Sequence, residues 1–191
     1  MGYNGSYYDR DAPLLETFQG GRHATDCDGG AWLKKLLPDA LSASAGAVPN
    51  GIVFRLAEAY LNYAEALNEA QGPVPAAYEA VNTIRARSGM PKLPAGLTKE
   101  QFRDRVRNER DIELAFEDHR LYDIRRWKIA ENDGVMQGSF YGLKITKITG
   151  STDFKYEPYV FETRTFLTRM YLHPFLNTEV FKGYLVQNPG Y

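Results

Sequence analysis

One stretch of this chain, residues 98–116, has the spacing of an amphipathic helix but carries charged residues on its apolar face. Residues three, four and seven positions apart lie on the same side of a helix. The face defined in this way consists of Phe102, Val106, Glu109, Glu113 and Phe116. A buried carboxylate without a partner is very costly, so both glutamates require cations or hydrogen-bond donors nearby. The pattern therefore predicts a helix whose buried face contains ion pairs.

The cations for these pairs are predicted from the arginines of the same region. We expect a partly buried polar network that joins this helix to the next one, formed by Glu109, Arg110, Glu113, Glu117, Arg120, Asp123 and Arg126. Two interpretations are open: a catalytic carboxylate pair, or a structural network that holds two helices together. The pattern favours the structural interpretation, because ion-pair networks without any catalytic role also gather charges in this way.

The remaining pattern predicts helices followed by a small β element. Apolar residues recur at helical spacing in residues 52–70, 75–88, 99–116 and 120–131. Thr98 and Gln101 form a capping-box pattern at the start of the third helix. Three β-prone segments, residues 144–149, 156–161 and 164–167, predict an antiparallel meander. The expected fold is mainly α, with a small antiparallel β element.

The first two predicted helices form one helical hairpin of the size found in TPR repeats. Residues 1–51, which are rich in Gly, Asp, Ser and Pro, are predicted to be mostly loop. A single repeat cannot bury its own hydrophobic faces, and this leaves Tyr60, Tyr63 and Leu67 without partners. We therefore expect the chain to pack against an N-terminal half or a neighbouring copy.

Composition narrows the class of function. A net charge of -1 argues against a protein that binds nucleic acid through its phosphates. The chain has 3 His and 1 Cys, which argues against a structural zinc site of four such ligands. The pairs His119 with Asp123 and His23 with Cys27 have no second ligand cluster, and residues 26–30 lack the terminal Glu of a calcium loop. No metal or other cofactor is predicted.

Four segments resemble one protein family. The run E-R-x-x-E-L-x-x-E-x-x-R-x-x-D-I-R-R-W at residues 109–127, called the signature below, resembles the C-terminal signature of the SusD/RagB family of outer-membrane glycan-binding lipoproteins. Residues 55–66 look like the last TPR-like helix of that family, and residues 82–91 look like the helix and turn that follow it. Residues 171–191 look like its closing segment. The resemblance extends from residue 54 to the end of the chain.

The resemblance implies a domain division, a function and a location for this protein. Residues 52–191 would form the SusD/RagB-like C-terminal domain, and residues 1–51 would pack on an N-terminal half encoded upstream. The whole protein would bind oligosaccharides without cleaving them and pass them to a SusC-like TonB-dependent transporter. It would face outward from the outer membrane, held there only by an upstream lipid anchor.

Residues that contact sugar are predicted from their chemistry, because the family's sugar contacts come from variable loops. In the loop-rich start, the rings of Tyr7, Tyr8 and Trp32 could stack on pyranose rings. Arg22 and Asp28 could donate and accept hydrogen bonds to hydroxyl groups. The alternative for Trp32 is a place in the core with the leucines that follow it.

Two other functions are consistent with the same residues. A glycoside hydrolase would use Glu109, Glu113 or Asp123 as acid and nucleophile. A TPR-like protein-interaction scaffold would have no sugar site. Turnover of a glycan separates the hydrolase from the other two functions, and glycan binding without turnover separates the capture protein from the scaffold.

Overall fold

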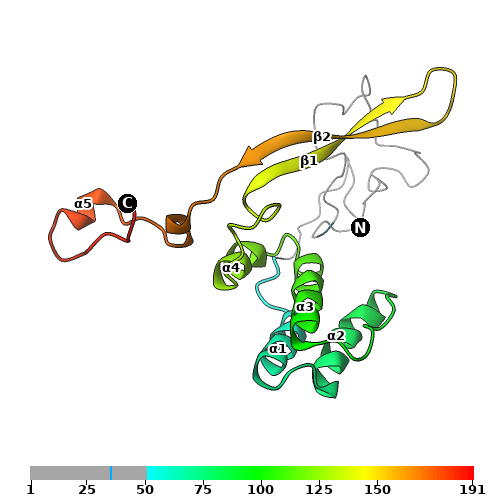
Figure 1. Ribbon diagram of the computed structural model, residues 1–191, viewed down its shortest axis with the longest axis horizontal. Coiled ribbons are helices and arrows are strands. Elements are labelled where there is room, and N and C mark those ends of the chain that lie inside the picture. The colour runs from blue at the N-terminus through cyan, green and yellow to red at the C-terminus, as the bar shows by residue number, and fades with distance from the viewer. Residues whose placement is uncertain (1–34, 36–50) are drawn as a thin grey trace. The chain divides into compact units, whose positions relative to one another are not determined.

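The computed structural model describes Lys35 and residues 51–191. Contacts divide this part of the chain into a unit that ends at Asp123 and a unit that begins at Ile124. The elements, in order (Figure 1), are α1 (Leu56–Gln71), α2 (Pro75–Arg87), α3 (Lys99–Glu113), α4 (His119–Arg126), β1 (Gly138–Lys147), β2 (Phe154–Arg164), the 3-10 helix η1 (Thr168–Tyr171) and α5 (Asn177–Val180). This confirms a mainly helical fold with a small antiparallel sheet. The division into residues 1–51 and 52–191 stays a prediction.

Helices α1, α2 and α3 pack around two apolar clusters. The larger, called the core below, has as its buried members Ala64, Ala77, Ala80, Val81, Leu93, Phe102 and Val106, and the smaller has Leu61, Ile84 and Leu114. The small alanine side chains let α1 and α2 approach closely. Phe102 and Val106 of α3 pack against these two helices. Tyr60 and Leu67 pack against this core while partly buried, whereas Tyr63 is 52% exposed. That the hairpin packs against a further part of the protein stays a prediction.

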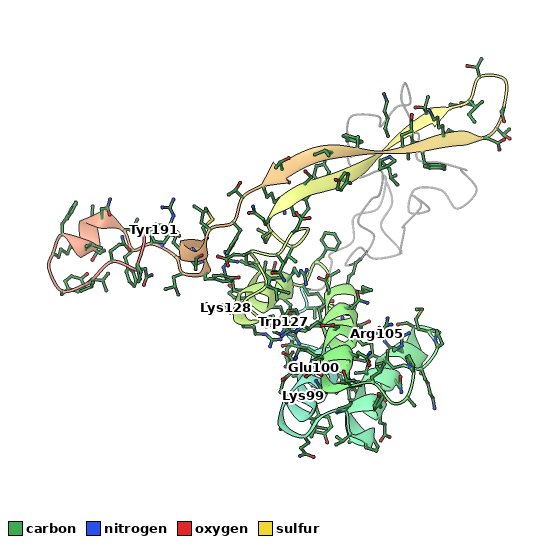
Figure 2. The ribbon with its side chains drawn as sticks, in the orientation of Figure 1. Lys99, Glu100, Arg105, Trp127, Lys128 and Tyr191 are labelled. Carbon is green, nitrogen blue, oxygen red and sulfur yellow. The ribbon has the colours of Figure 1, made fainter. Side chains whose placement is uncertain are left out.

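The start of α3 is capped as its sequence predicts. The Thr98 hydroxyl oxygen accepts from the Gln101 backbone N–H at 3.2 Å, and the Gln101 side-chain oxygen accepts from the Thr98 N–H at 3.0 Å. These two bonds satisfy donors that a helix start leaves unpaired. On the side of α3 away from the core, Glu100 and Arg105 are exposed (Figure 2). The helix is therefore amphipathic, with its polar side open to water.

Helices α3 and α4 end earlier than the sequence pattern predicts. Helix α3 stops at Glu113, and Phe116 lies outside it with a φ of 62° and 68% of its surface exposed. The prediction that Phe116 shares the buried face was therefore wrong. Helix α4 stops at Arg126, and Lys128 has a φ of 57°. After the end of each helix, at Phe116 and at Lys128, a residue other than glycine adopts the left-handed conformation, which the amphipathic pattern does not reveal.

The predicted three-stranded meander was wrong, because the region forms two longer strands. Strands β1 and β2 pair antiparallel along their length. Phe140 pairs with Glu162 and Tyr141 pairs with Val160, so Phe161 is the extra residue of a bulge. The third predicted segment, residues 164–167, overlaps β2 only at Arg164 and otherwise lies outside the strands.

The second unit has a small core of its own. Its buried members are Ile124, Ala130 and Phe166. The Tyr171 ring meets the Phe166 ring edge to face, with 5.0 Å between centroids, and the Arg125 guanidinium lies 5.7 Å from the Phe166 ring centroid. None of the helices within residues 51–191 is both long and apolar enough to span a bilayer.

Candidate functional site

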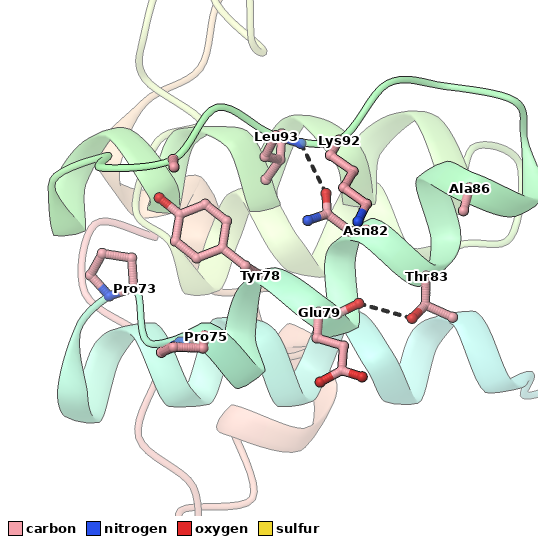
Figure 3. A pocket seen from close by; sticks show the side chains of 10 residues that line it. Pro73, Pro75, Tyr78, Glu79, Asn82, Thr83, Ala86, Lys92 and Leu93 are labelled. Carbon is pink, nitrogen blue, oxygen red and sulfur yellow. Dashed lines mark hydrogen bonds between the residues drawn. The ribbon is translucent and has the colours of Figure 1, made fainter.

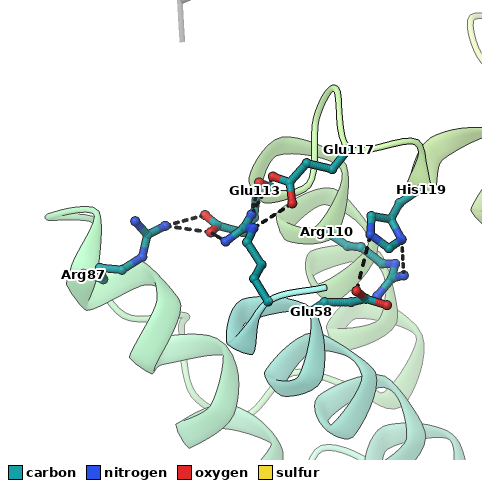
Figure 4. A network of polar contacts seen from close by, with 7 residues as sticks. Glu58, Arg87, Arg110, Glu113, Glu117 and His119 are labelled. Atoms are coloured by element: carbon teal, nitrogen blue, oxygen red, sulfur yellow. Dashed lines mark hydrogen bonds and ion pairs between the residues drawn. The ribbon is translucent and has the colours of Figure 1, made fainter. Parts of the chain in front are cut away.

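The signature contributes most members of several groups of ion pairs in the first unit, some of which are shown in Figure 4. On α3, Glu109 is 9% exposed, and the Glu113 side chain is 10% exposed. These glutamates lie one turn apart, so helical spacing directs both toward the neighbouring elements. Carboxylates this deeply buried are stable only with charged partners.

Arg110 and Asp123 form the most buried pair. The Arg110 Nε donates to Asp123 Oδ2 at 2.6 Å, and each side chain is 5% exposed. The Nη1 of Arg110 also donates to the Asn62 side-chain oxygen of α1 at 2.6 Å. One guanidinium therefore joins α3 to both α1 and α4.

Arg55 bonds to two further carboxylates of the signature. Its Nη1 donates to Glu113 Oε1 at 2.5 Å, and its Nε donates to Glu117 Oε2 at 2.7 Å. Burial lowers the pKa of Arg55, but the hydrogen bonds with Glu117 and Glu113 outweigh this effect and leave the pKa raised. Arg87 of α2 adds a second cation, with its Nη2 2.7 Å and 2.8 Å from the two Glu113 oxygens.

Arg85 provides the partner of the remaining glutamate. Its Nη1 donates to Glu109 Oε2 at 2.6 Å, and its Nε donates to the Pro91 carbonyl at 2.7 Å. The Arg85 side chain is 15% exposed. This arginine therefore ties the end of α2 both to α3 and to the loop that follows α2.

The structure thus separates the seven residues of the predicted network. Glu109, Glu113 and Glu117 bond to two arginines of α2 and to Arg55, the residue before α1, whereas Arg110 and Asp123 form a buried pair between α3 and α4. Arg120 forms an exposed pair with Asp111. The Arg126 guanidinium lies over the Trp127 ring, 4.7 Å from its centroid.

Sequence reasoning missed Arg55, Arg85 and Arg87 as partners of the signature. The available signal was their position at helix ends, with Arg55 just before α1 and the other two in the last turn of α2. Cations at a helix C-terminus are commonly explained by the helix dipole alone. The helix dipole therefore accounts for Arg85 and Arg87 without indicating that they form ion pairs with Glu109 and Glu113 of α3.

His119 and Asp123, which the sequence places one turn apart, are both held by protein groups. The His119 Nε2 lies 3.4 Å from Glu58 Oε2, and its Nδ1 lies 3.4 Å from Arg110 Nη2 (Figure 4). Asp123 is bonded to the same arginine. Within residues 51–191, no group of three or more His, Cys, Asp or Glu residues is arranged to hold a metal ion.

The predicted sugar contacts are not among the described residues. They are Tyr7, Tyr8, Arg22, Asp28 and Trp32. The same is true of His23 and Cys27, the second pair considered as metal ligands. These predictions therefore remain untested.

The second unit contains a concave surface of about 480 Å³ whose lining includes Arg125, Glu162, Arg164, Phe166, His173 and Tyr191. The Arg164 Nη2 donates to Glu162 Oε2 at 2.6 Å, and this hydrogen bond lowers the pKa of the Glu162 carboxyl. The Arg164 guanidinium also lies 4.4 Å from the centroid of the Phe140 ring. Two of the charges at this surface are therefore paired with each other.

A surface ion pair between α1 and α3 makes stability depend on pH. Arg103 donates to both Glu69 oxygens, at 2.6 Å and 2.7 Å, and this hydrogen bonding lowers the pKa of the Glu69 carboxyl from its ordinary value. A depressed carboxyl pKa stabilises the fold above the unfolded pKa, and this contribution is lost as pH falls through the folded value. Because Glu69 is 43% exposed, Glu69→Gln is expected to lower unfolding free energy at pH 7 by less than about 1 kcal/mol.

The measurement is urea unfolding of the wild type and Glu69→Gln at a series of pH values from 7 downward. The difference in stability between the two proteins should shrink as the pH falls through the lowered folded pKa of Glu69, because the wild-type carboxyl then takes up a proton. A difference that grows with acid would contradict the assignment.

The SusD family model matches residues 20–191. Two proteins of Formosa agariphila are similar. SusD-like protein P25 is 43% identical over 83 residues, covering 42% of this chain and 16% of that protein, and SusD-like protein P2 is 39% identical over 87 residues, covering 42% and 17%. The chain thus spans about a sixth of the length of these relatives.

Two solved structures are similar in fold. A SusD-like protein from Bacteroides fragilis matches with a TM-score of 0.66 and 40% identity, covering 75% of this chain and 26% of that chain. A SusD superfamily protein from Parabacteroides distasonis matches with a TM-score of 0.50 and 22% identity, covering 73% and 27%. The described helices and hairpin therefore correspond to about a quarter of each of these longer chains.

Proposed function

The chain belongs to the SusD family, and from this premise we propose that it is part of a protein that binds oligosaccharides without cleaving them. Binding would serve nutrient uptake at the outer membrane, with the sugar passed to a SusC-like TonB-dependent transporter. The protein would be an outward-facing lipoprotein whose anchor precedes this segment. Family membership supports these assignments of location and partner.

One observation supports binding over hydrolysis: the carboxylates of the signature are occupied by arginines. Glu109 accepts from Arg85, Glu113 accepts from Arg55 and Arg87, and Asp123 accepts from Arg110. A glycosidase needs one protonated carboxyl beside the glycosidic oxygen and a second carboxylate across the bond. A buried carboxylate that is bonded to an arginine of its own fold is not placed to contact the glycosidic oxygen of a substrate. The network is therefore better suited to holding the fold than to acid catalysis.

The sugar contacts that we propose remain Tyr7, Tyr8, Trp32, Arg22 and Asp28. Aromatic rings stack on the apolar faces of pyranoses, and charged side chains bond to the hydroxyls at the rim. The exposed Tyr63 of α1 supports a second part of the proposal, that this segment packs against an N-terminal half like that of its longer relatives.

We expect the intact protein to bind oligosaccharides with a dissociation constant on the order of micromolar or weaker and to release no product. Weak binding is expected because a capture protein must pass its ligand on. The test is incubation with a panel of oligosaccharides, followed by calorimetry for binding and chromatography for new reducing ends.

The controls are Glu109→Gln and Glu113→Gln, each checked for folding by circular dichroism. New reducing ends that disappear in either variant would replace the proposal with a hydrolase. Absence of binding across the panel would favour a different cargo or the TPR-like scaffold.

A further inference from the structure

A groove runs along the outer side of α2, between that helix and the loop that leads to α3 (Figure 3). Its volume is about 790 Å³, within the range of small-molecule sites. The lining residues that matter here are Pro73, Pro75, Tyr78, Asn82, Lys92 and Leu93. All of them belong to the first unit. We call this feature the α2 groove.

One end of the α2 groove is apolar and rigid. Pro73 and Pro75 present ring surfaces beside the Tyr78 ring (Figure 3). The Tyr78 ring meets the Phe102 ring edge to face at 4.7 Å, and its hydroxyl oxygen accepts from the Leu97 N–H at 3.0 Å. The tyrosine is therefore fixed at both its ring and its hydroxyl. A ring held in this way offers a stacking surface with little loss of conformational freedom.

The other end carries hydrogen-bond donors in a fixed orientation. The Asn82 Oδ1 accepts from the Leu93 N–H at 2.9 Å, which orients its amide, and its NH₂ group donates to no other group within residues 51–191. Figure 3 shows the Lys92 ammonium beside this amide, while the Glu79 carboxylate points away from both. Lys92 forms no ion pair with another described residue. Two sets of donors therefore face the same space.

From this juxtaposition we propose that the α2 groove is an additional oligosaccharide subsite, an assignment that rests on the proposed function. One sugar ring lies with its C–H face on the surface of Pro73, Pro75 and Tyr78. Its hydroxyl oxygens accept hydrogen bonds from the Asn82 NH₂ group and the Lys92 ammonium. The combination of an apolar ring surface and adjacent donors matches the two sides of a pyranose, whose C–H groups and hydroxyls alternate around the ring.

The test uses ¹⁵N-labelled protein and a panel of cellohexaose, maltohexaose, xylohexaose and mannohexaose. The side-chain NH₂ signals of Asn82, assigned by their loss in Asn82→Asp, are expected to shift during titration with at least one of these sugars. Asp at this position keeps the oxygen that accepts from Leu93 and removes the donor. Asn82→Asp and Lys92→Met should each weaken binding of that sugar roughly fivefold, as expected for one lost hydrogen bond.

The matched control is Lys147→Met, which removes an exposed lysine from β1 and should leave the affinity unchanged. Circular dichroism of each variant checks that α1 to α3 remain folded. Calorimetric binding with unshifted Asn82 signals and unaffected variants would overturn the α2 groove assignment and leave the proposed function standing. Failure of the wild type to bind any sugar of the panel would overturn both.

Discussion

Replacing Asp123 with alanine is expected to lower the free energy of unfolding by about 4 kcal/mol, because it leaves a buried guanidinium without its counterion. Asp123 and Arg110 are each 5% exposed, and 2.6 Å separates the bonded atoms. Once the carboxylate is gone, Arg110 retains only its bond to the Asn62 amide oxygen and its contact with His119. The measurement is urea unfolding followed by far-UV circular dichroism.

The same two helices provide a matched control. Asp111 of α3 and Arg120 of α4 form an ion pair at 3.2 Å, but their side chains are 41% and 43% exposed. Asp111→Ala is therefore expected to change stability by less than about 1 kcal/mol. Equal losses for Asp111→Ala and Asp123→Ala would show that burial does not decide the effect.

A double replacement distinguishes two causes of destabilisation: losing the ion pair, and leaving one buried charge without a counterion. Arg110→Met combined with Asp123→Leu removes both buried charges and fills the space with apolar atoms. This variant should recover most of the stability lost in Asp123→Ala, because replacing a whole buried pair is often neutral or stabilising. Asn62 is exposed, so water can take over the hydrogen bond that Arg110 made. A double variant as unstable as Asp123→Ala would contradict this account.

Short sequence patterns predicted the helices well, because apolar spacing and capping residues are local signals of helix formation. The apolar spacing on α2 and the capping residues Thr98 and Gln101 act within a few positions along the chain. The start of α1, at Leu56, was harder to predict from the sequence. The chain is extended at Arg55, yet residues 52–54 are as apolar as the buried face of the helix that follows.

The ends of α3 and α4 depend on backbone conformations that composition does not signal. Phe116, Asp118 and Lys128 have positive φ values, although none of them is glycine. Such positions are strained for ordinary side chains and persist only when the surrounding structure holds them. At the first of these breaks, the Glu117 carboxylate is fastened by Arg55. The Arg55–Glu117 ion pair therefore lies beside the left-handed residues Phe116 and Asp118, and the spacing of apolar residues along α3 indicates neither of these features.

The sequence predicted that the signature glutamates form buried ion pairs, but it did not predict which arginines are their partners. The buried positions of Glu109 and Glu113 follow from helical spacing, and the need for cations follows from the cost of burying charge. Which arginines provide that charge depends on how three helices pack. Arg85 and Arg87 lie 24 and 26 residues before the glutamates to which they bond. Spacing along one helix carries no information about such partners.

Replacing Arg55 with alanine is expected to destabilise the chain by about 3 kcal/mol, because one side chain serves two buried carboxylates. The Glu117 side chain is 4% exposed and accepts from Arg55, while Glu113 keeps Arg87 as a second cation. The Arg55 Nη2 also donates to the Glu113 backbone carbonyl at 2.5 Å, near the end of α3. Urea unfolding of the variant measures the loss.

Arg87→Ala is the control, because this arginine bonds to the same Glu113 but is 62% exposed. It should change stability by less than about 1 kcal/mol, since water already screens that pair. Arg55→Lys should fall between the two, because an ammonium keeps the charge but cannot reproduce the fork that bonds Glu113 and Glu117 together. If Arg55→Lys were as stable as the wild type, charge alone would hold these carboxylates. Loss in the lysine variant would instead show that guanidinium geometry fastens the chain before α1 to the turn after α3.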